Sequence, residues 1–279
     1  MNIEALTGSP ATSTTSLGGT ARRVELADGR TVVAKRHDQV TALRAEVAGL
    51  RWLAEPAAVP LPEVLGHDDE WLVVDLVVPG AASAGAAEGF GRGLARLHAA
   101  GAPAFGSPPP DGPADAWIGL APMRNVTGDA WPAWYAEHRV RPYLRGAVDQ
   151  SVLAGGDARA IETVCERIES LAGPAEPPAR LHGDLWSGNV QWSADGRGWL
   201  IDPAAHGGHR ETDLAMLHLF GCARLDRIVA AYDETTPLAD GWRGRVGLHQ
   251  LFPLLVHTVL FGGGYPSQAA SAARAALRG

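Results

Sequence analysis

The sequence predicts an α+β protein with two lobes: a small amino-terminal lobe built on an antiparallel sheet, and a larger, mainly helical second lobe. Two hairpin patterns with a helix between them fill the first eighty residues, a Pro-Gly pair follows, and helical patterns dominate the remainder. A chain of 279 residues is also long for a single domain. We assign residues 1–78 to the first lobe and residues 79–279 to the second, with a ligand expected in the cleft between them.

The first lobe begins with a hairpin and a helix. β-branched residues lie around Val24 and at residues 31–33, and the dipeptide Asp28-Gly29 between them is typical of a tight hairpin turn. Apolar side chains at helical spacing then predict a helix over residues 39–55.

A second hairpin is expected after this helix. Residues 64–65 form a short apolar run, residues 67–70 a polar turn, and residues 71–78 an apolar strand, "WLVVDLVV". The Pro-Gly pair that follows cannot continue a strand, so this is where the chain should cross to the second lobe.

The second lobe consists largely of helical patterns. Residues 107–117 read as a proline-rich surface loop, and two short strands flank the turn "SADGRG". Helices are expected at residues 81–100, 131–145, 157–173 and, after the segment at residues 213–221, nearly to the end, where an alanine-rich tail from Ser267 should fray.

Composition and charge exclude several classes of protein. The formal net charge of −7 argues against a nucleic-acid binder, because phosphate contacts need a basic surface. The most apolar run, residues 251–265, is short and contains Pro253 and His257, which predicts a core helix and not a membrane span. The first ten residues lack the apolar core of a secretory signal. We expect a cytoplasmic monomer with no nucleic-acid or membrane partner.

The stretch "RLHGDLWSGNV", residues 180–190, carries the strongest chemical signal. Asn189 lies five positions after Asp184, and Asp202 follows at the end of the next expected strand, in "LIDP". Asn189 and Asp202 offer hard oxygen ligands for Mg²⁺, which leaves Asp184 free to accept a hydroxyl proton. The same order of residues occurs in protein kinases. The alternative is that Asp184 and Asn189 only cap turns.

Upstream residues fit the same chemistry. Lys35 ends the strand "TVVAK", where a kinase-like lobe holds a lysine for the α- and β-phosphates of ATP, and Glu46 on the next helix is placed to pair with it. A solvated ion pair is the simpler reading. The turn at Gly18, Gly19 and Thr20 could cover the phosphates with backbone N–H groups, although it lacks the G-x-G-x-x-G spacing.

Two further parts of the chain are candidates for ligand contacts. The connector at Val74, Asp75 and Leu76 could bind adenine through its backbone, although the sequence also fits an ordinary buried strand. Trp186, between Asp184 and Asn189, could serve as an aromatic platform for a sugar ring, with core packing as the alternative.

Histidines near the motif raise the question of a metal centre. The stretch "HGGHRETDL" offers His206, His209 and Glu211, and a site with histidine ligands would be one reading. We favour a different role for the region, in which His182 and Asp213 bond the backbone of the catalytic loop and hold its shape.

Several segments together resemble the fructosamine kinase (ketosamine-3-kinase) family. The likeness runs from about Gly18 to Tyr265, and the most specific segment has a Trp-Ser-Gly insert that distinguishes it from choline and aminoglycoside kinases. The segments are "LHGDLWSGNV", "LIDPAAHGGHRETDLAML", "GLARLH", "WYAEHRV" and "HQLFPLLVHTVLFGGGY".

The resemblance implies a bilobal protein kinase-like fold, of the aminoglycoside phosphotransferase variant, and a deglycation activity. The expected reaction is ATP-dependent phosphorylation of the sugar 3-hydroxyl of ketosamines, which are adducts of an amine with glucose or ribose. Carried over to this chain, the resemblance makes Asp184 the base, Asn189 and Asp202 the Mg²⁺ ligands, and Lys35 the phosphate lysine with Glu46 as its partner. Many relatives also carry a cysteine in the phosphate-covering strand that supports a redox-switched dimer, and "TSLGGTARRVEL" has none.

Two other functions remain open from the sequence. One is a kinase for another small hydroxyl substrate, such as an aminoglycoside or choline. The other is a non-catalytic nucleotide-binding protein, which predicts that a catalytic residue is missing, and none is.

Overall fold

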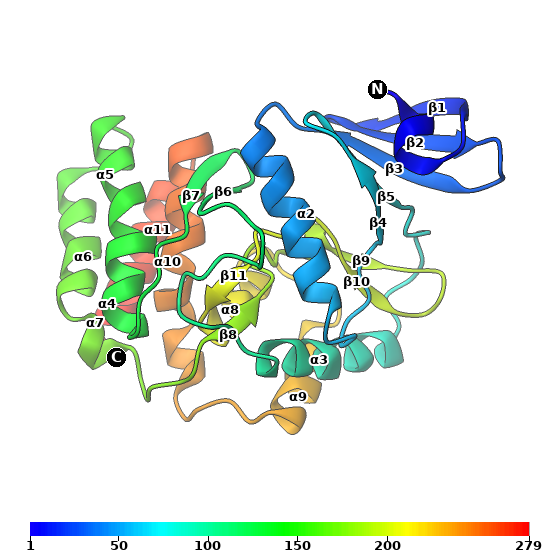
Figure 1. Cartoon of the computed structure of the whole chain (residues 1–279). Coiled ribbons are helices and arrows are strands. Elements are labelled where there is room, and N and C mark those ends of the chain that lie inside the picture. Colours follow the sequence, from blue (N-terminus) through cyan, green and yellow to red (C-terminus); the bar gives the residue numbers. More distant parts are fainter. Residues whose placement is uncertain (279) are drawn as a thin grey trace.

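The computed structural model describes residues 1–278 and shows a sheet-based lobe beside a helical lobe (Figure 1). The first lobe contains α1 (Ile3–Thr7), β1 (Ala11–Gly18), β2 (Ala21–Leu26), β3 (Thr31–Arg36), α2 (Val40–Ala54), β4 (Val64–His67) and β5 (Trp71–Asp75). The second contains α3 (Ala84–Ala99), β6 (Asp115–Ile118), β7 (Ala121–Arg124), α4 (Trp131–Tyr135), a π-helical turn (Ala136–Val140), α5 (Arg141–Asp149), α6 (Gly155–Glu166), α7 (Ile168–Leu171), β8 (Ala179–Leu181), a 3₁₀ turn (Ser187–Asn189), β9 (Val190–Trp192), β10 (Gly198–Leu200), β11 (His206–Gly208), α8 (Arg210–Leu219), α9 (Leu225–Thr235), α10 (Trp242–Phe261) and α11 (Tyr265–Arg278).

The five strands of the first lobe form one antiparallel sheet in the order β1-β2-β3-β5-β4. β2 and β3 make the predicted hairpin, in which Val24 pairs with Val32 and Gly29 takes a φ of +89° at the turn. β5 pairs with β3 as far as Asp75, which lies opposite Val32. Among residues 1–278, no pairing of β5 with β3 continues beyond Asp75. The chain therefore leaves the sheet after Asp75. The expected strand, which ran to Val78, was three residues too long.

Helix α2 connects the two lobes, and its position confirms the predicted helix (Figure 1). Its apolar face packs under the sheet against Leu72 and Val74, through Leu43, Val47 and Leu50. On the side of the second lobe, the Trp117 indole of β6 donates a hydrogen bond to the Thr41 hydroxyl at 3.0 Å. The helix that carries Glu46 is thus held by both lobes.

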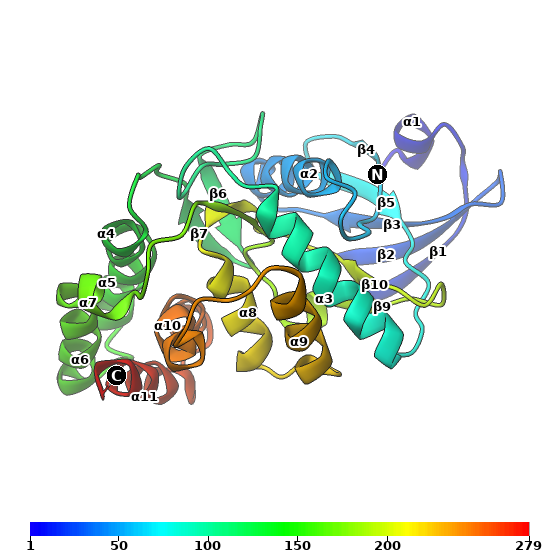
Figure 2. The same cartoon turned by 90° about the horizontal axis from the view of Figure 1, so that it is seen from below.

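The helices of the second lobe lie side by side below the strands, with α3 against α9, α8 against α10 and α10 against α11 (Figure 2). Helix α10 is buried along most of its length, which confirms the expected core helix. Within residues 1–278, no helix is long and apolar enough to cross a membrane. The alanine-rich tail is not a frayed end: Ala269, Ala270 and Ala273 are buried, because small side chains let α11 approach α10 and α6 closely.

Several elements have no clear signal in the sequence. Every residue of β1 is exposed, so the strand lacks the alternation that marks a half-buried strand. The hairpin β6–β7 begins within the stretch expected to be a loop and turns at Gly119 and Leu120. The helix expected over residues 131–145 is interrupted by the π-helical turn, where the Arg139 side chain is buried. The short pair β8–β11 was likewise not indicated.

Candidate active site

The loop after β8 is held from below by one buried carboxylate. Asp213, near the start of α8, accepts hydrogen bonds from the backbone N–H groups of His182 at 2.8 Å and Gly183 at 3.0 Å. His98 of α3 lies 3.2 Å from the same carboxylate. Gly183 has a φ of +83°, and a Cβ there would lie 2.1 Å from the Ala204 carbonyl oxygen, so the turn requires glycine. These contacts fix the backbone from which the next residue, Asp184, projects.

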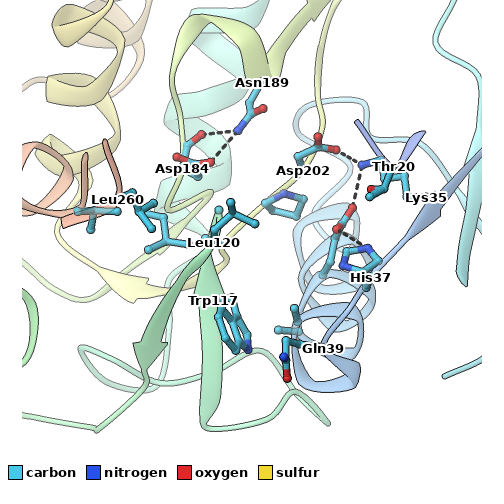
Figure 3. A pocket seen from close by; sticks show the side chains of 18 of the residues that line it. Thr20, Lys35, His37, Gln39, Trp117, Leu120, Asp184, Asn189, Asp202 and Leu260 are labelled. Atoms are coloured by element: carbon cyan, nitrogen blue, oxygen red, sulfur yellow. Dashed lines mark hydrogen bonds and ion pairs between the residues drawn. The ribbon is translucent and has the colours of Figure 1, made fainter. Parts of the chain in front are cut away.

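The carboxylate of Asp184 faces the amide of Asn189 (Figure 3). Asn189 Nδ2 donates to the Asp184 carboxylate at 3.1 Å and to its backbone oxygen at 2.8 Å. Burial raises the pKa of Asp184 to about 6, although the hydrogen bond from Asn189 acts in the opposite direction. Asp184 is therefore a carboxylate at neutral pH with a proton affinity suited to a general base.

Lys35 and Glu46 form an ion pair between β3 and α2, with 2.9 Å between Nζ and Oε1. His37 lies 3.2 Å from the other oxygen of Glu46. Burial acts to raise the pKa of Glu46, but Lys35 and His37 outweigh it and hold the pKa at about 2. Lys35 also contacts the carboxylate of Asp202 (Figure 3). The lysine is thus placed between the helix of the first lobe and the strand end of the second.

The donor set at Asn189 and Asp202 fits a hard divalent cation. Asp202 has a φ of +55°, a conformation that non-glycine residues adopt infrequently, and nearly half of its side chain is exposed toward the cavity. Among residues 1–278, the side chain of Asn189 makes its hydrogen bonds through Nδ2, which leaves Oδ1 for an ion. Carboxylate and amide oxygens are the ligands that Mg²⁺ prefers.

Two cavities meet at Lys35 and Asp202. The larger, with a volume of about 530 Å³, contains Asp184, Asn189, Trp186, Glu46 and Thr20. The smaller, about 230 Å³, is mainly apolar and lies between the sheet and the β9 region. Both are lined by Lys35 and Asp202.

The smaller cavity is bordered by the predicted connector. Val74, Asp75 and Leu76 all line it. The backbone N–H of Asp75 already donates to the Glu63 carbonyl at 3.2 Å, so that group is not free for a ligand. The sequence did not point to the other lining residues, which come from separate parts of the chain and include Leu17, Val33, Leu50, Val77, Gln191 and Ile201.

The turn at Gly18, Gly19 and Thr20 connects β1 to β2 at the edge of these cavities. Gly18 and Gly19 have φ values of +104° and +52°, and a Cβ at either would find no atom within 4 Å. Thr20 lines the larger cavity. The backbone here is open and unobstructed, as a segment that covers a ligand would need to be.

Trp186 is 40% exposed and lines the larger cavity, so it does not belong to the core. Its indole folds over Gly188, where a Cβ would lie 2.2 Å from the ring. The glycine of the Trp-Ser-Gly insert therefore leaves room for the outer edge of the indole.

The histidine-rich stretch forms an ion-pair network. Ligand atoms of His209, Glu211 and His249 lie within 4.8 Å of one another. Arg245, however, donates hydrogen bonds to both carboxylate oxygens of Glu211, at 2.9 and 2.5 Å. The ring of Trp131 stacks on that of His249, with 4.5 Å between the ring centroids. A guanidinium on the only carboxylate repels a cation, so the geometry argues against a metal centre here.

Four residues that sequence reasoning missed contribute to the region. His98 contacts Asp213, and its Nδ1 lies 2.8 Å from the hydroxyl oxygen of Tyr232. His37 and His257 line the larger cavity. The motif "GLARLH" contains His98, but no spacing rule links it to Asp213, which lies 115 positions later.

A sheet-based lobe, a lysine–glutamate pair and an Asp-Asn-Asp set around joined cavities define a protein kinase-like phosphotransferase. Comparison with known proteins specifies it further. The sequence profile of the family described as fructosamine kinase matches residues 17–278. The chain belongs to the fructosamine kinase family.

Individual relatives agree with this assignment. A "Probable ketoamine kinase" of Synechocystis sp. is 33% identical over 241 residues, which cover 84% of this chain and 78% of that protein. A crystal structure of a Thermobifida fusca protein named as a fructosamine-3-kinase is 46% identical, with a TM-score of 0.93 over 99% of this chain and 97% of the other. Choline kinase LicA from Streptococcus pneumoniae, 14% identical with a TM-score of 0.63 over 99% of this chain and 96% of its own, shares the fold alone. The expected kinase-like bilobal fold is thereby confirmed.

Proposed function

We propose that this protein transfers the γ-phosphoryl group of ATP to the sugar 3-hydroxyl of ketosamines. The observation that carries the proposal is that Lys35 and Asp202 line both cavities. With adenine in the apolar cavity, the phosphates of ATP pass Lys35 and enter the cavity that contains Asp184. Membership of the fructosamine kinase family supports the choice of acceptor.

Asp184 acts as the base for the acceptor hydroxyl. Above about pH 6 it is a carboxylate, and the hydrogen bond from Asn189 orients it. The acceptor proton passes to Asp184 as the oxygen bonds to the γ-phosphorus, the bond to the bridging oxygen breaks, and ADP leaves.

The side of the cavity that contains Lys35 binds the phosphates of ATP. Glu46 holds Lys35 in place, and Lys35 exchanges its contact with Asp202 for the phosphate oxygens. Asn189 and Asp202 would hold Mg²⁺, which supplies positive charge to neutralise the phosphates. Turnover that survives an excess of chelator would contradict this part of the proposal.

Trp186 positions the sugar. Its exposed ring offers a flat apolar surface beside Asp184, and sugar rings commonly stack on such surfaces. A sugar held there with its 3-hydroxyl toward Asp184 is phosphorylated at that oxygen because of position and not intrinsic reactivity. Phosphorylated ketosamines are unstable and release the amine, which makes the activity a deglycation.

A substrate panel tests the proposal. The enzyme is incubated with Mg-ATP and synthetic fructoselysine or ribuloselysine, beside choline and kanamycin, and the phosphate is located by NMR. We expect phosphate on the 3-hydroxyl of the ketosamines. Phosphorylation of choline or kanamycin without any ketosamine product, or phosphate at another hydroxyl, would refute it.

A further inference from the structure

The larger cavity has two walls of opposite character. The first lobe contributes a polar wall, with Lys35, Arg36, His37, Asp38 and Glu46. The second lobe contributes Asp184, Asn189 and Asp202 and, beside them, a second wall formed by the β6–β7 turn, the end of α10 and Trp186. Within this second wall, among residues 1–278, no lining residue is an aspartate or a glutamate. Figure 3 shows Leu120 and Leu260 on the side of Asp184, away from Lys35 and His37.

Exposed apolar side chains gather on the second wall. Leu120 is 77% exposed, Phe261 61% and Trp186 40%, and all three line the same cavity. Within residues 1–278, only nine large hydrophobic residues are exposed, so three in one cavity is a concentration and not random scatter. Single exposed hydrophobic residues need no explanation, but a cluster at the mouth of a cavity indicates a binding surface.

His257 is the one ionisable group on this wall. Its Nδ1 lies 2.7 Å from the Pro253 carbonyl oxygen, which can only accept, so Nδ1 carries the proton. Burial lowers the pKa of His257, which keeps the ring neutral. Nε2 is therefore a hydrogen-bond acceptor in a wall that otherwise has only apolar side chains and the Trp117 and Trp186 indoles.

The phosphates of ATP restrict where the rest of the acceptor can lie. They need the cations of the polar wall, above all Lys35, and the acceptor hydroxyl needs Asp184. The part of the acceptor that does not react is left with the apolar wall. In a ketosamine this part is the amine and the group it carries, since the amine is bonded two carbons from the 3-hydroxyl carbon.

We infer that the apolar wall of Leu120, Leu260 and Phe261 binds the group carried by the ketosamine amine, and that His257 accepts a hydrogen bond from the amine itself. The inference rests on the proposed function and adds the substrate class. The preferred substrates are ketosamines of amines with apolar or aromatic substituents. A second ammonium or a carboxylate on the substituent would find no opposite charge on this wall.

A series of fructose adducts tests the substrate class. Adducts of methylamine, benzylamine and 1,4-diaminobutane share the sugar and the reacting hydroxyl and differ only in the substituent. We expect kcat/KM for the benzylamine adduct to exceed that of the diaminobutane adduct by about tenfold, the effect of burying part of a phenyl ring. The methylamine adduct is the reference.

Substitutions on the wall show whether it is the cause. Leu120→Ser or Phe261→Ser should each lower the benzylamine-to-methylamine ratio of kcat/KM by about three- to tenfold, mainly through KM. Both residues are exposed, so neither change opens a cavity in the core. Val148→Ser is the matched control, because Val148 is 46% exposed on α5 and does not line the cavity, and its ratio should equal that of the unmodified enzyme.

His257→Phe isolates the acceptor nitrogen. The ring keeps its shape and loses Nε2. We compare the methylamine adduct with 1-O-methylfructose, in which an ether oxygen replaces the amine and cannot donate a hydrogen bond. The unmodified enzyme should prefer the amine by about tenfold or more, and His257→Phe should abolish that preference. A purely structural role for His257 would lower both rates and keep the ratio.

Equal use of the benzylamine and diaminobutane adducts, or a ratio that Leu120→Ser and Phe261→Ser leave unchanged, would overturn the inference. An amine preference that survives in His257→Phe would remove the role of His257. Failure of the proposed function has a different signature, because then no adduct, including the methylamine adduct, is phosphorylated.

Discussion

The loop that carries Asp184 and the turn at residues 18–20 both line the larger cavity and are held very differently. The catalytic loop rests on Asp213, which is almost fully buried and binds two backbone N–H groups, with His98 and Tyr232 behind it. The turn at residues 18–20 follows a strand whose residues are all exposed, and a Cβ at either of its glycines would find no atom within 4 Å.

This difference matches two different tasks: the loop positions the catalytic carboxylate, and the turn is proposed to bind the nucleotide. The base must be positioned within a fraction of an ångström before the substrate arrives, which a network of buried hydrogen bonds achieves. We propose that the turn admits ATP and then covers it, a task that suits a segment with few fixed contacts. Changes to the loop should therefore impair catalysis strongly, and changes to the turn should affect nucleotide binding mildly.

The largest effect is expected from Asp184→Asn. The amide keeps the shape of the side chain and cannot accept the proton, so turnover should fall roughly 10²- to 10⁴-fold. Nucleotide affinity should stay nearly unchanged, because Asp184 faces the acceptor and not the phosphates. Steady-state kinetics and ATP titration measure the two quantities. Near-normal turnover in a folded variant would show that Asp184 is not the base.

Asp213→Asn tests the support of the loop. The carboxylate of Asp213 now accepts hydrogen bonds from two backbone N–H groups. An amide has only one oxygen, so its NH₂ group would face one of these donors and that hydrogen bond would be lost. The free energy of unfolding should therefore fall by about 3 kcal/mol. Turnover should fall by about tenfold as the loop loses its position. Denaturant unfolding and kinetics provide the readouts. Asp195→Asn is the control, since Asp195 binds Arg197 in the exposed β9–β10 turn, where solvent screens the charge, and the change should leave the free energy of unfolding nearly unchanged.

The pH dependence of kcat/KM reports on Asp184 in the free enzyme. Its pKa is raised to about 6, and only the deprotonated form accepts a proton. Above this pH, kcat/KM for the ketosamine should be constant, and below it kcat/KM should fall about tenfold per pH unit. The residual activity of Asp184→Asn should lack this decline. A profile that stays flat down to pH 5, in protein shown to be folded there, would contradict the assignment.

The sequence predicted the catalytic loop better than its surroundings, for a physical reason. Asp184, Asn189 and Asp202 are close in the chain, so their spacing alone constrains their arrangement. The pairing of Lys35 with Glu46 could be predicted because protein kinases pair a lysine on this strand with a glutamate on the following helix. Most of the apolar wall could not be predicted, because Leu120 and Phe261 come from distant segments and look like ordinary hydrophobic residues in the sequence.

The same reasoning explains the errors in secondary structure. Strand β1 is recognisable only from its partner β2, since its residues are mostly polar and all of them are exposed. The tail after Ser267 looks like an isolated alanine-rich helix, and only the surface of α10 shows why its alanines are buried. In both cases tertiary contacts supply what the local pattern lacks.

The smallest effect is expected at the turn, from Gly18→Ala. Gly18 has a φ of +104°, which an alanine adopts only with strain, although its Cβ would meet no other atom. The turn should therefore relax to another conformation, and KM for ATP should rise about three- to tenfold while kcat changes less than twofold.

Gly29→Ala is the matched control. Gly29 has a φ of +89° and equally open surroundings, and it lies in the turn between β2 and β3, at the other end of β2 from Gly18. Both variants should lose a similar amount of stability, about 1 kcal/mol, in thermal unfolding, and only Gly18→Ala should change KM for ATP. Equal changes of KM in the two variants would mean that general loosening of the sheet, and not the covering turn, controls nucleotide binding.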